Sequence, residues 1–289
     1  MNGRDKAVEP FGYCLNTSTI RGQELGLLEE LGVAAEAGYD AVEPWVRELD
    51  AYIQQGGTLK EVRRRAEGLD LTIENLVGFF DWVVDDSEQR HAGLEEARRN
   101  MHMASEVGCT KLAAPPSGAT DVEGMDLLAA AERYADLLRI GEEYGVIPVV
   151  EFWGVSKTLG RLGEAVLVAV QSGHEDACVL ADVFHMYKGG SPYEGLRLLG
   201  PRTLGLVHVN DFPADPSRSR ITDAGRVYPG DGVAPLPRIL GYLREIGFRG
   251  TLSLELFNQS YWEQDALTVA RTGLEKMRRL VGEATETGG

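Results

Sequence analysis

The sequence contains few cysteines and few histidines. Three of its 289 residues are cysteine and five are histidine. Cys14, Cys109 and Cys178 lie in separate strand-like stretches, and none has a cysteine neighbour at the spacing of a metal or redox motif. This number and spacing argue against a disulfide framework, and we interpret the three thiols as small core residues.

Long apolar runs and an excess of positive charge are absent as well. No segment approaches the roughly 20 apolar residues that a membrane span needs, and the first ten residues, "MNGRDKAVEP", lack the apolar segment of a signal peptide. The 29 Lys and Arg face 45 Asp and Glu, and the resulting charge of −16 repels a phosphate backbone. We therefore expect a cytoplasmic protein that binds neither membranes nor nucleic acid.

Short apolar runs alternate with amphipathic helical patterns along the chain. Helical patterns cover residues 24–38, 95–108 and 124–145, each closed by a glycine, and a last one covers 262–280. The predicted strands are residues 11–15, 39–44, 71–77, 109–114, 146–153, 177–184, 203–210 and 251–257.

These eight strand–helix units predict an α/β fold, a single (β/α)₈ TIM barrel, because right-handed crossovers close such a repeat into a barrel. An open doubly wound sheet is the alternative, but no GxGxxG follows the first strand. No linker or change of composition divides the chain. We predict one domain over residues 1–289, with 1–10 and 281–289 as tails.

Four consecutive predicted strands carry a metal-binding type of side chain near their carboxyl ends, where barrel enzymes place their chemistry. A lone acid there is often a rim residue, but aligned carboxylates repel one another unless a cation compensates them. Such ligands suit one divalent ion, Mn²⁺ first, with Mg²⁺, Co²⁺ or Zn²⁺ as alternatives. The four residues are Glu151 in "VVEFWG", Asp182 in "VLADVFH", His208 in "LVHVND" and Glu255 in "LSLELF".

The motifs "VEFWG", "LADVFHMYKGG", "LVHVND", "GRVYPGDG" and "LSLELF" make the sequence similar to the sugar phosphate isomerase/epimerase family of xylose isomerase-like TIM barrels, over nearly the whole chain. The resemblance implies the same four metal ligands. It also implies that His185, the histidine of the DxxH motif, and Arg226, which precedes the PGxG loop, contact oxygens of the substrate. Arg218 and Arg220 in the preceding loop are rivals for the role of Arg226.

Such a site supports proton transfer next to a carbonyl. A divalent ion chelated by the carbonyl and a neighbouring hydroxyl of a sugar acidifies the adjacent C–H and stabilises the enediolate. Glu151 and Glu255 can then act as catalytic bases on opposite sides of one carbon. We expect a metal-dependent isomerase or epimerase of a sugar, sugar phosphate or keto-polyol. Loss of a β-hydroxyl on the same site would make it a dehydratase, which remains the alternative.

Further residues are candidates for substrate binding. Glu43 and Glu74 lie near strand ends, where they either bind sugar hydroxyls or hold loops, and Trp153 suits the apolar face of a sugar ring. Lys157 departs from the family, because some of its ketose epimerases have Glu six residues after the first metal Glu. We expect this lysine to favour a phosphate or carboxylate on a small-molecule carbohydrate substrate. The family also implies a homodimer or homotetramer.

Two other classes of function are disfavoured. The DNA repair endonuclease branch of the superfamily needs a trinuclear site, with more histidine and aspartate ligands than the five histidines here supply. A barrel retained only as a binding protein would be expected to have lost a ligand, and all four are present.

Overall fold

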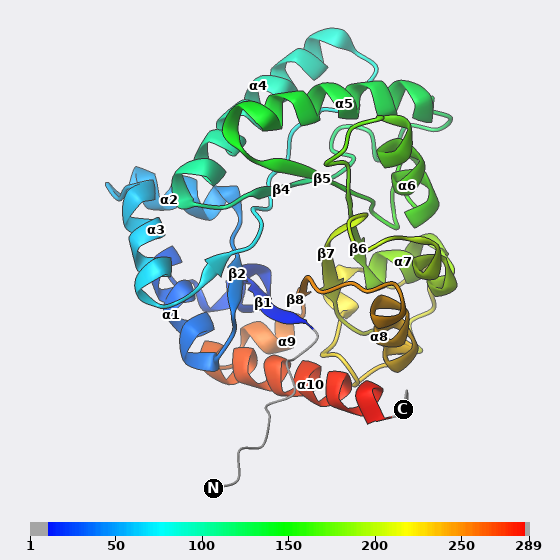
Figure 1. Ribbon diagram of the computed structural model, residues 1–289. Helices are drawn as coiled ribbons and strands as arrows, with labels where there is room; N and C mark the ends of the chain where they lie inside the picture. Colours follow the sequence, from blue (N-terminus) through cyan, green and yellow to red (C-terminus); the bar gives the residue numbers. More distant parts are fainter. Residues whose placement is uncertain (1–10, 287–289) are drawn as a thin grey trace, which may run out of the picture.

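The computed structural model describes residues 11–286 and contains an eight-stranded, wholly parallel sheet surrounded by helices (Figure 1). The strand order is β3-β2-β1-β8-β7-β6-β5-β4. The two outer strands meet through a parallel bridge between Leu76 and Leu112, where the Leu76 amide donates to the Lys111 carbonyl at 3.1 Å. The sheet is therefore closed, as predicted for a TIM barrel.

Each predicted strand overlaps an observed one; β1 is shifted by one residue from the predicted 11–15, and the other observed strands are shorter than predicted. The predicted strand 71–77 keeps only two residues of regular ladder. The predicted strand 177–184 ends at Asp182, because that carboxylate accepts the His185 amide at 2.9 Å and caps a helix there. The strands are β1 (Gly12–Asn16), β2 (Ala41–Glu43), β3 (Thr72–Ile73), β4 (Lys111–Ala114), β5 (Ile147–Glu151), β6 (Val179–Asp182), β7 (Leu204–Val209) and β8 (Thr251–Leu254).

The helices form the outer ring (Figure 1). Gly38, Gly108 and Gly145 end three of them with positive φ, the left-handed cap predicted from the sequence. The α-helices are α1 (Leu27–Ala37), α2 (Val46–Gln54), α3 (Leu59–Gly68), α4 (Ser87–Val107), α5 (Leu127–Tyr144), α6 (Leu162–Gln171), α7 (Val183–Gly189), α8 (Leu236–Glu245), α9 (Gln259–Trp262) and α10 (Ala266–Glu286). Short 3-10 helices are η1 (Thr17–Gln23), η2 (Tyr193–Leu198) and η3 (Asp223–Gly225).

The last helix differs from its prediction. It continues to Glu286, past the expected boundary at residue 281, because Leu280, Val281 and Ala284 remain buried in the main hydrophobic core. The expected tail at residues 1–10 lies outside the described residues.

Two hydrophobic clusters hold the barrel. The larger one joins the strands to the surrounding helices, and the smaller one contains Ala113, Val149, Cys178, Leu180 and Leu206 of neighbouring strands and their ends. All three cysteines are buried and unpaired, which confirms their interpretation as core residues. Among residues 11–286, no helix combines the length and the apolar character needed to cross a membrane.

Candidate active site

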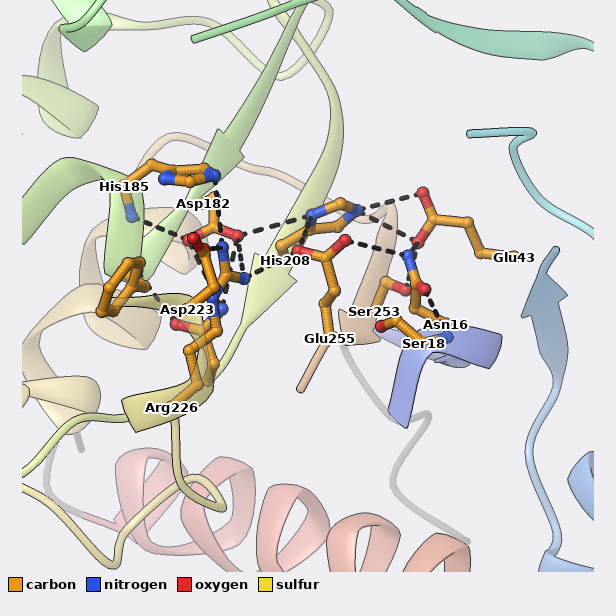
Figure 2. Close-up of polar contacts among 12 residues, drawn as sticks. Asn16, Ser18, Glu43, Asp182, His185, His208, Asp223, Arg226, Ser253 and Glu255 are labelled. Atoms are coloured by element: carbon orange, nitrogen blue, oxygen red, sulfur yellow. Dashed lines mark hydrogen bonds and ion pairs between the residues drawn. The ribbon is translucent and has the colours of Figure 1, made fainter. Parts of the chain in front are cut away.

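Three of the four predicted metal ligands meet at the carboxyl ends of β6, β7 and β8 (Figure 2). Asp182 pairs with His208 in the sheet register, and Glu255 follows directly after β8. Their ligand atoms all lie within 4.8 Å of one another, and all three side chains are buried. The parallel barrel therefore brings one imidazole and two carboxylates together, as the spacing along the chain predicts.

His208 has a ring nitrogen with no hydrogen bond. Its Nε2 lies 3.0 Å from both carboxylate oxygens of Glu43. Its Nδ1 lies 3.1 Å from Glu255 Oε2 and 3.5 Å from Asp182 Oδ2, but it forms no hydrogen bond with either. Burial lowers the pKa of His208, yet Glu255 and Glu43 outweigh it and hold the pKa well above its ordinary value. This buried nitrogen and the two carboxylate oxygens that face it, one from Glu255 and one from Asp182, are suitable ligands for a divalent cation.

Glu43 lies behind His208. Its carboxylate is fully buried and accepts hydrogen bonds from Asn75 Nδ2 at 2.7 Å, Ser253 Oγ at 2.6 Å and Asn16 Nδ2 at 3.0 Å. Burial raises its pKa, but the charge of His208 and these hydrogen bonds bring the net pKa below its usual value. The geometry does not support the expected contact of Glu43 with sugar hydroxyls. Instead, its carboxylate orients the His208 ring, as carboxylates behind metal-binding histidines do.

The cavity beside this cluster has a volume of about 290 Å³. Glu151, the last residue of β5, is buried in its wall together with Glu255 and His185. Burial raises the pKa of Glu151 to about 8, with His208 opposing the shift and Glu255 adding to it. Glu151 does not belong to the group of three within residues 11–286. Its assignment as the fourth ligand therefore stays a prediction.

The raised pKa of Glu151 has a consequence for stability. The folded protein keeps a proton on Glu151 up to about pH 8, whereas the unfolded chain loses it near the ordinary value of 4.5. This group therefore makes the chelator-treated protein less stable as pH rises between these values. Glu151→Gln should match the wild type near pH 4.5 and exceed its free energy of unfolding by about 3–5 kcal/mol near pH 9. Urea unfolding at several pH values measures this, and a difference that does not change with pH contradicts it.

Arg226 joins the cluster on the side away from Glu43 (Figure 2) and lines the cavity. Its Nη1 donates to Asp182 Oδ2 at 2.8 Å and to Glu255 Oε2 at 2.7 Å. Its Nη2 and Nε donate to Asp223 Oδ1 at 2.6 and 3.2 Å, and Nη2 faces His185 Nε2 at 3.2 Å. Only 1% of Arg226 is exposed, and burial opposes the charge that Asp182 and Asp223 favour, but its pKa is raised overall. The guanidinium thus holds together three carboxylates.

The long loop after β7 is fixed where it presents Arg226. Asp211 forms an antiparallel bridge with Val227, and its carboxylate accepts the amides of Gly230 and Gly232, each at 3.0 Å. A Cβ on Gly232 would lie 2.2 Å from a backbone carbonyl oxygen, so this turn requires glycine. The rivals Arg218 and Arg220 are exposed. Contact between Arg226 and substrate remains a prediction.

His185 lies in the first turn of α7 and is nearly buried. Its Nδ1 faces the amide of Gly154 at 3.3 Å, and a Cβ on Gly154 would lie 2.5 Å from the Gly189 amide nitrogen. Burial lowers the pKa of His185, with Asp182 opposing the shift and Arg226 adding to it. A neutral ring accepts at only one nitrogen, and here both nitrogens face donors, the Gly154 amide at Nδ1 and Arg226 Nη2 at Nε2. The contact of His185 with substrate oxygens stays a prediction.

Aromatic side chains line the rest of the cavity and form what we call the aromatic wall: Trp153, Phe79, Trp45 and Phe257. Neighbouring rings meet edge to face, with centroids 5.6, 5.5 and 6.1 Å apart in that order. Trp153 therefore lies where a substrate contact was predicted. Phe79 and Phe257 were not singled out; Phe257 ends the predicted strand 251–257, but the observed β8 already ends at Leu254.

Lys157 is not placed at the cavity. Its Nζ pairs with Glu123 at 2.9 Å, and 48% of its side chain is exposed. Its expected role in binding a substrate phosphate or carboxylate therefore finds no support in the geometry. Glu74 is also directed elsewhere, because it pairs with Lys111 where β3 and β4 approach. Both side chains form ion pairs outside the cavity lining.

Sequence reasoning missed the uncharged partners of the cluster. Asn210 accepts the Phe184 amide at 2.9 Å, and its Nδ2 lies 3.3 Å from Asp182 Oδ2. Asn16 and Ser253 bind Glu43 from β1 and β8. The available signal was the position of Asn16 and Asn210 at or directly after strand ends, next to the ligand-bearing strands.

Comparison with known proteins finds relatives that match most of the chain. A family model described as xylose isomerase-like TIM barrel matches residues 31–280. The inosose isomerase of Bacillus velezensis is 26% identical over 282 residues, covering 93% of this chain and 97% of that protein. The 3-dehydroshikimate dehydratase of Pseudomonas aeruginosa is 28% identical over 273 residues, covering 90% of this chain and 40% of that protein.

Solved structures show the same fold. The crystal structure of the IOLI protein with a binding zinc atom has a TM-score of 0.86 at 22% identity and covers 94% of this chain and 99% of that chain. The structure of L-ribulose 3-epimerase has a TM-score of 0.78 at 16% identity and covers 96% of both chains. At these identities the likeness concerns the fold alone.

Proposed function

Since the chain belongs to the xylose isomerase-like TIM barrel family, we propose that it is an isomerase or epimerase of a sugar or keto-polyol that works by metal-assisted proton transfer. The observation that carries this proposal is the convergence of Asp182, His208 and Glu255, with Glu151 beside them in one cavity. The similarity to inosose isomerase over nearly the full length of both proteins supports it.

Different residues of the cavity would carry out different parts of the reaction. A divalent cation held by Asp182, His208 and Glu255 would polarise a substrate carbonyl and acidify the neighbouring C–H bond. His185 lines the same cavity, where its ring can contact a substrate oxygen. Glu151 can take and return the proton, and its raised pKa suits a carboxylate that exchanges protons near neutral pH. The aromatic wall offers an apolar surface to the apolar face of a sugar ring.

The charges around the cavity favour a substrate without phosphate. Among the described residues that line the cavity, Arg226 is the one Arg or Lys. It already makes four hydrogen bonds to carboxylates of the protein. Lys157 points elsewhere. Three buried carboxylates near the cavity would repel a phosphate. We therefore favour an uncharged sugar or keto-polyol over a sugar phosphate.

A proton-exchange screen tests the proposed function. The protein, loaded with Mn²⁺ or Zn²⁺, is incubated in D₂O with inososes, keto-sugars and their phosphates, and NMR follows each C–H. We expect exchange next to the carbonyl of an unphosphorylated compound and conversion to an epimer or isomer. Absence of exchange with every compound, under conditions where elemental analysis shows bound metal, contradicts the proposal.

A dehydratase is the second candidate, because the 3-dehydroshikimate dehydratase of Pseudomonas aeruginosa matches most of this chain. The match spans 40% of that protein. The same cluster would acidify a C–H bond next to a carbonyl, and the step would end with loss of a β-hydroxyl as water. In the same screen, an enone product in place of an epimer would identify this activity.

A further inference from the structure

Asn16 ends β1 and is fully buried between two carboxylates of the site (Figure 2). Its Nδ2 donates one hydrogen bond to Glu43 Oε2 at 3.0 Å and one to Glu255 Oε1 at 3.2 Å. An amide nitrogen has two hydrogens, so both are used. One side chain therefore connects the residue behind His208 with a residue of the candidate metal cluster.

The oxygen of the same amide is also saturated. Asn16 Oδ1 accepts the Ser18 amide at 3.0 Å, which caps helix η1, and the Trp45 indole N–H at 2.9 Å. Turning the amide over would place its NH₂ group against two donors and its oxygen against two carboxylates. Its orientation is therefore fixed by four hydrogen bonds with four different residues.

This orientation contributes to which oxygen of Glu255 faces the cation site. Asn16 binds Oε1, while Oε2 accepts Arg226 Nη1 at 2.7 Å and lies 3.1 Å from His208 Nδ1. On the other side of the ring, Asn16 helps to hold Glu43, whose oxygens face His208 Nε2 at 3.0 Å. The amide thus binds a carboxylate on each side of the imidazole.

We propose that Asn16 is a positioning residue that aims Glu255 Oε2 and His208 Nδ1 at a divalent cation and ties this arrangement to Trp45 of the aromatic wall. The inference deepens the proposed function and rests on its cation site. It assigns Asn16 no contact with the substrate. Residues behind metal ligands typically change metal affinity or activity by about 10- to 100-fold when they are replaced.

The test is Asn16→Ser, which keeps a hydroxyl able to cap η1 but removes the donors to both carboxylates. We expect the Kd for Zn²⁺, measured by competition with a chelator, to rise by about 10- to 100-fold. In the exchange reaction kcat should fall more than KM changes. Asp86→Ser is the matched control, because Asp86 caps α4 by accepting the Gln89 amide at 2.7 Å, on an exposed surface. It should leave the Kd for Zn²⁺ unchanged.

A wild-type Kd for Zn²⁺ in Asn16→Ser overturns the inference. If that variant does not fold by circular dichroism, Asn16→Thr, which fills more of the volume, is measured with the same expectation and the same contrary result. The two proposals fail in different ways. If no substrate exchanges protons with the wild type but both Asn16 variants weaken Zn²⁺ binding, the proposed reaction is wrong and the positioning role stands.

Discussion

Replacing Glu151 by Gln is expected to slow the exchange of the substrate C–H by about 10²- to 10⁴-fold, the usual contribution of a general base. Gln keeps the shape and one oxygen of the side chain but cannot accept the proton at neutral pH. Glu255→Gln should show a loss of similar size. NMR of exchange in D₂O gives the rate, and elemental analysis of each variant shows whether the metal is retained.

The two Gln variants should also differ from each other. If Glu151 and Glu255 act on opposite faces of one carbon, each variant should block deuterium uptake from one epimer more than from the other. Glu123→Gln is the control, because Glu123 is exposed and pairs with Lys157 away from the cavity. Small, equal losses in both variants, with the metal still bound, would show that another group is the base.

Replacing Arg226 by Met should lower the free energy of unfolding of the chelator-treated protein by about 3–5 kcal/mol, the usual cost of removing one partner of a buried ion pair. Met fills much of the volume but leaves Asp182, Glu255 and Asp223 without the guanidinium that binds them. Urea unfolding followed by circular dichroism measures the loss.

Two further variants show whether charge is the cause. Arg220→Met removes an arginine that is 71% exposed and pairs with Asp215, so its effect should stay within about 0.5 kcal/mol. Adding Asp223→Asn to Arg226→Met removes one uncompensated carboxylate and should recover part of the loss. If Arg226→Met is as stable as the wild type, the buried carboxylates do not depend on Arg226.

The fold was predictable because its signals repeat along the sequence. Each strand–helix unit carries its own apolar run, and three of the helical patterns also end in a glycine cap, so many weak signals agree on one closed barrel. Strand ends were less predictable. Glu74 lies in a stretch that reads as apolar and extended, yet the regular ladder of β3 ends at Ile73, and the chain beyond it makes only isolated bridges at Leu76 and Val77.

The candidate site was predictable at the level of positions and not of contacts. Asp182 and His208 could be paired in advance, because parallel strands bring their carboxyl ends to one edge. The enclosure of Glu43 behind His208 and the turn of Lys157 toward Glu123 depend on side-chain rotamers and loop paths. No spacing along the chain encodes these, so the roles expected for Glu43 and Lys157 were not supported.

The closure of the barrel is uneven, and this affects where the protein can open. The backbone pairing between β3 and β4 is limited to the bridge at Leu76 and Leu112, beside the Glu74–Lys111 ion pair, whereas β6, β7, β8 and β1 pair with one another over several residues each. Local unfolding starts where few hydrogen bonds must break. The wall of the barrel can therefore fluctuate at this seam while the strands that carry Asp182, His208 and Asn16 stay in register.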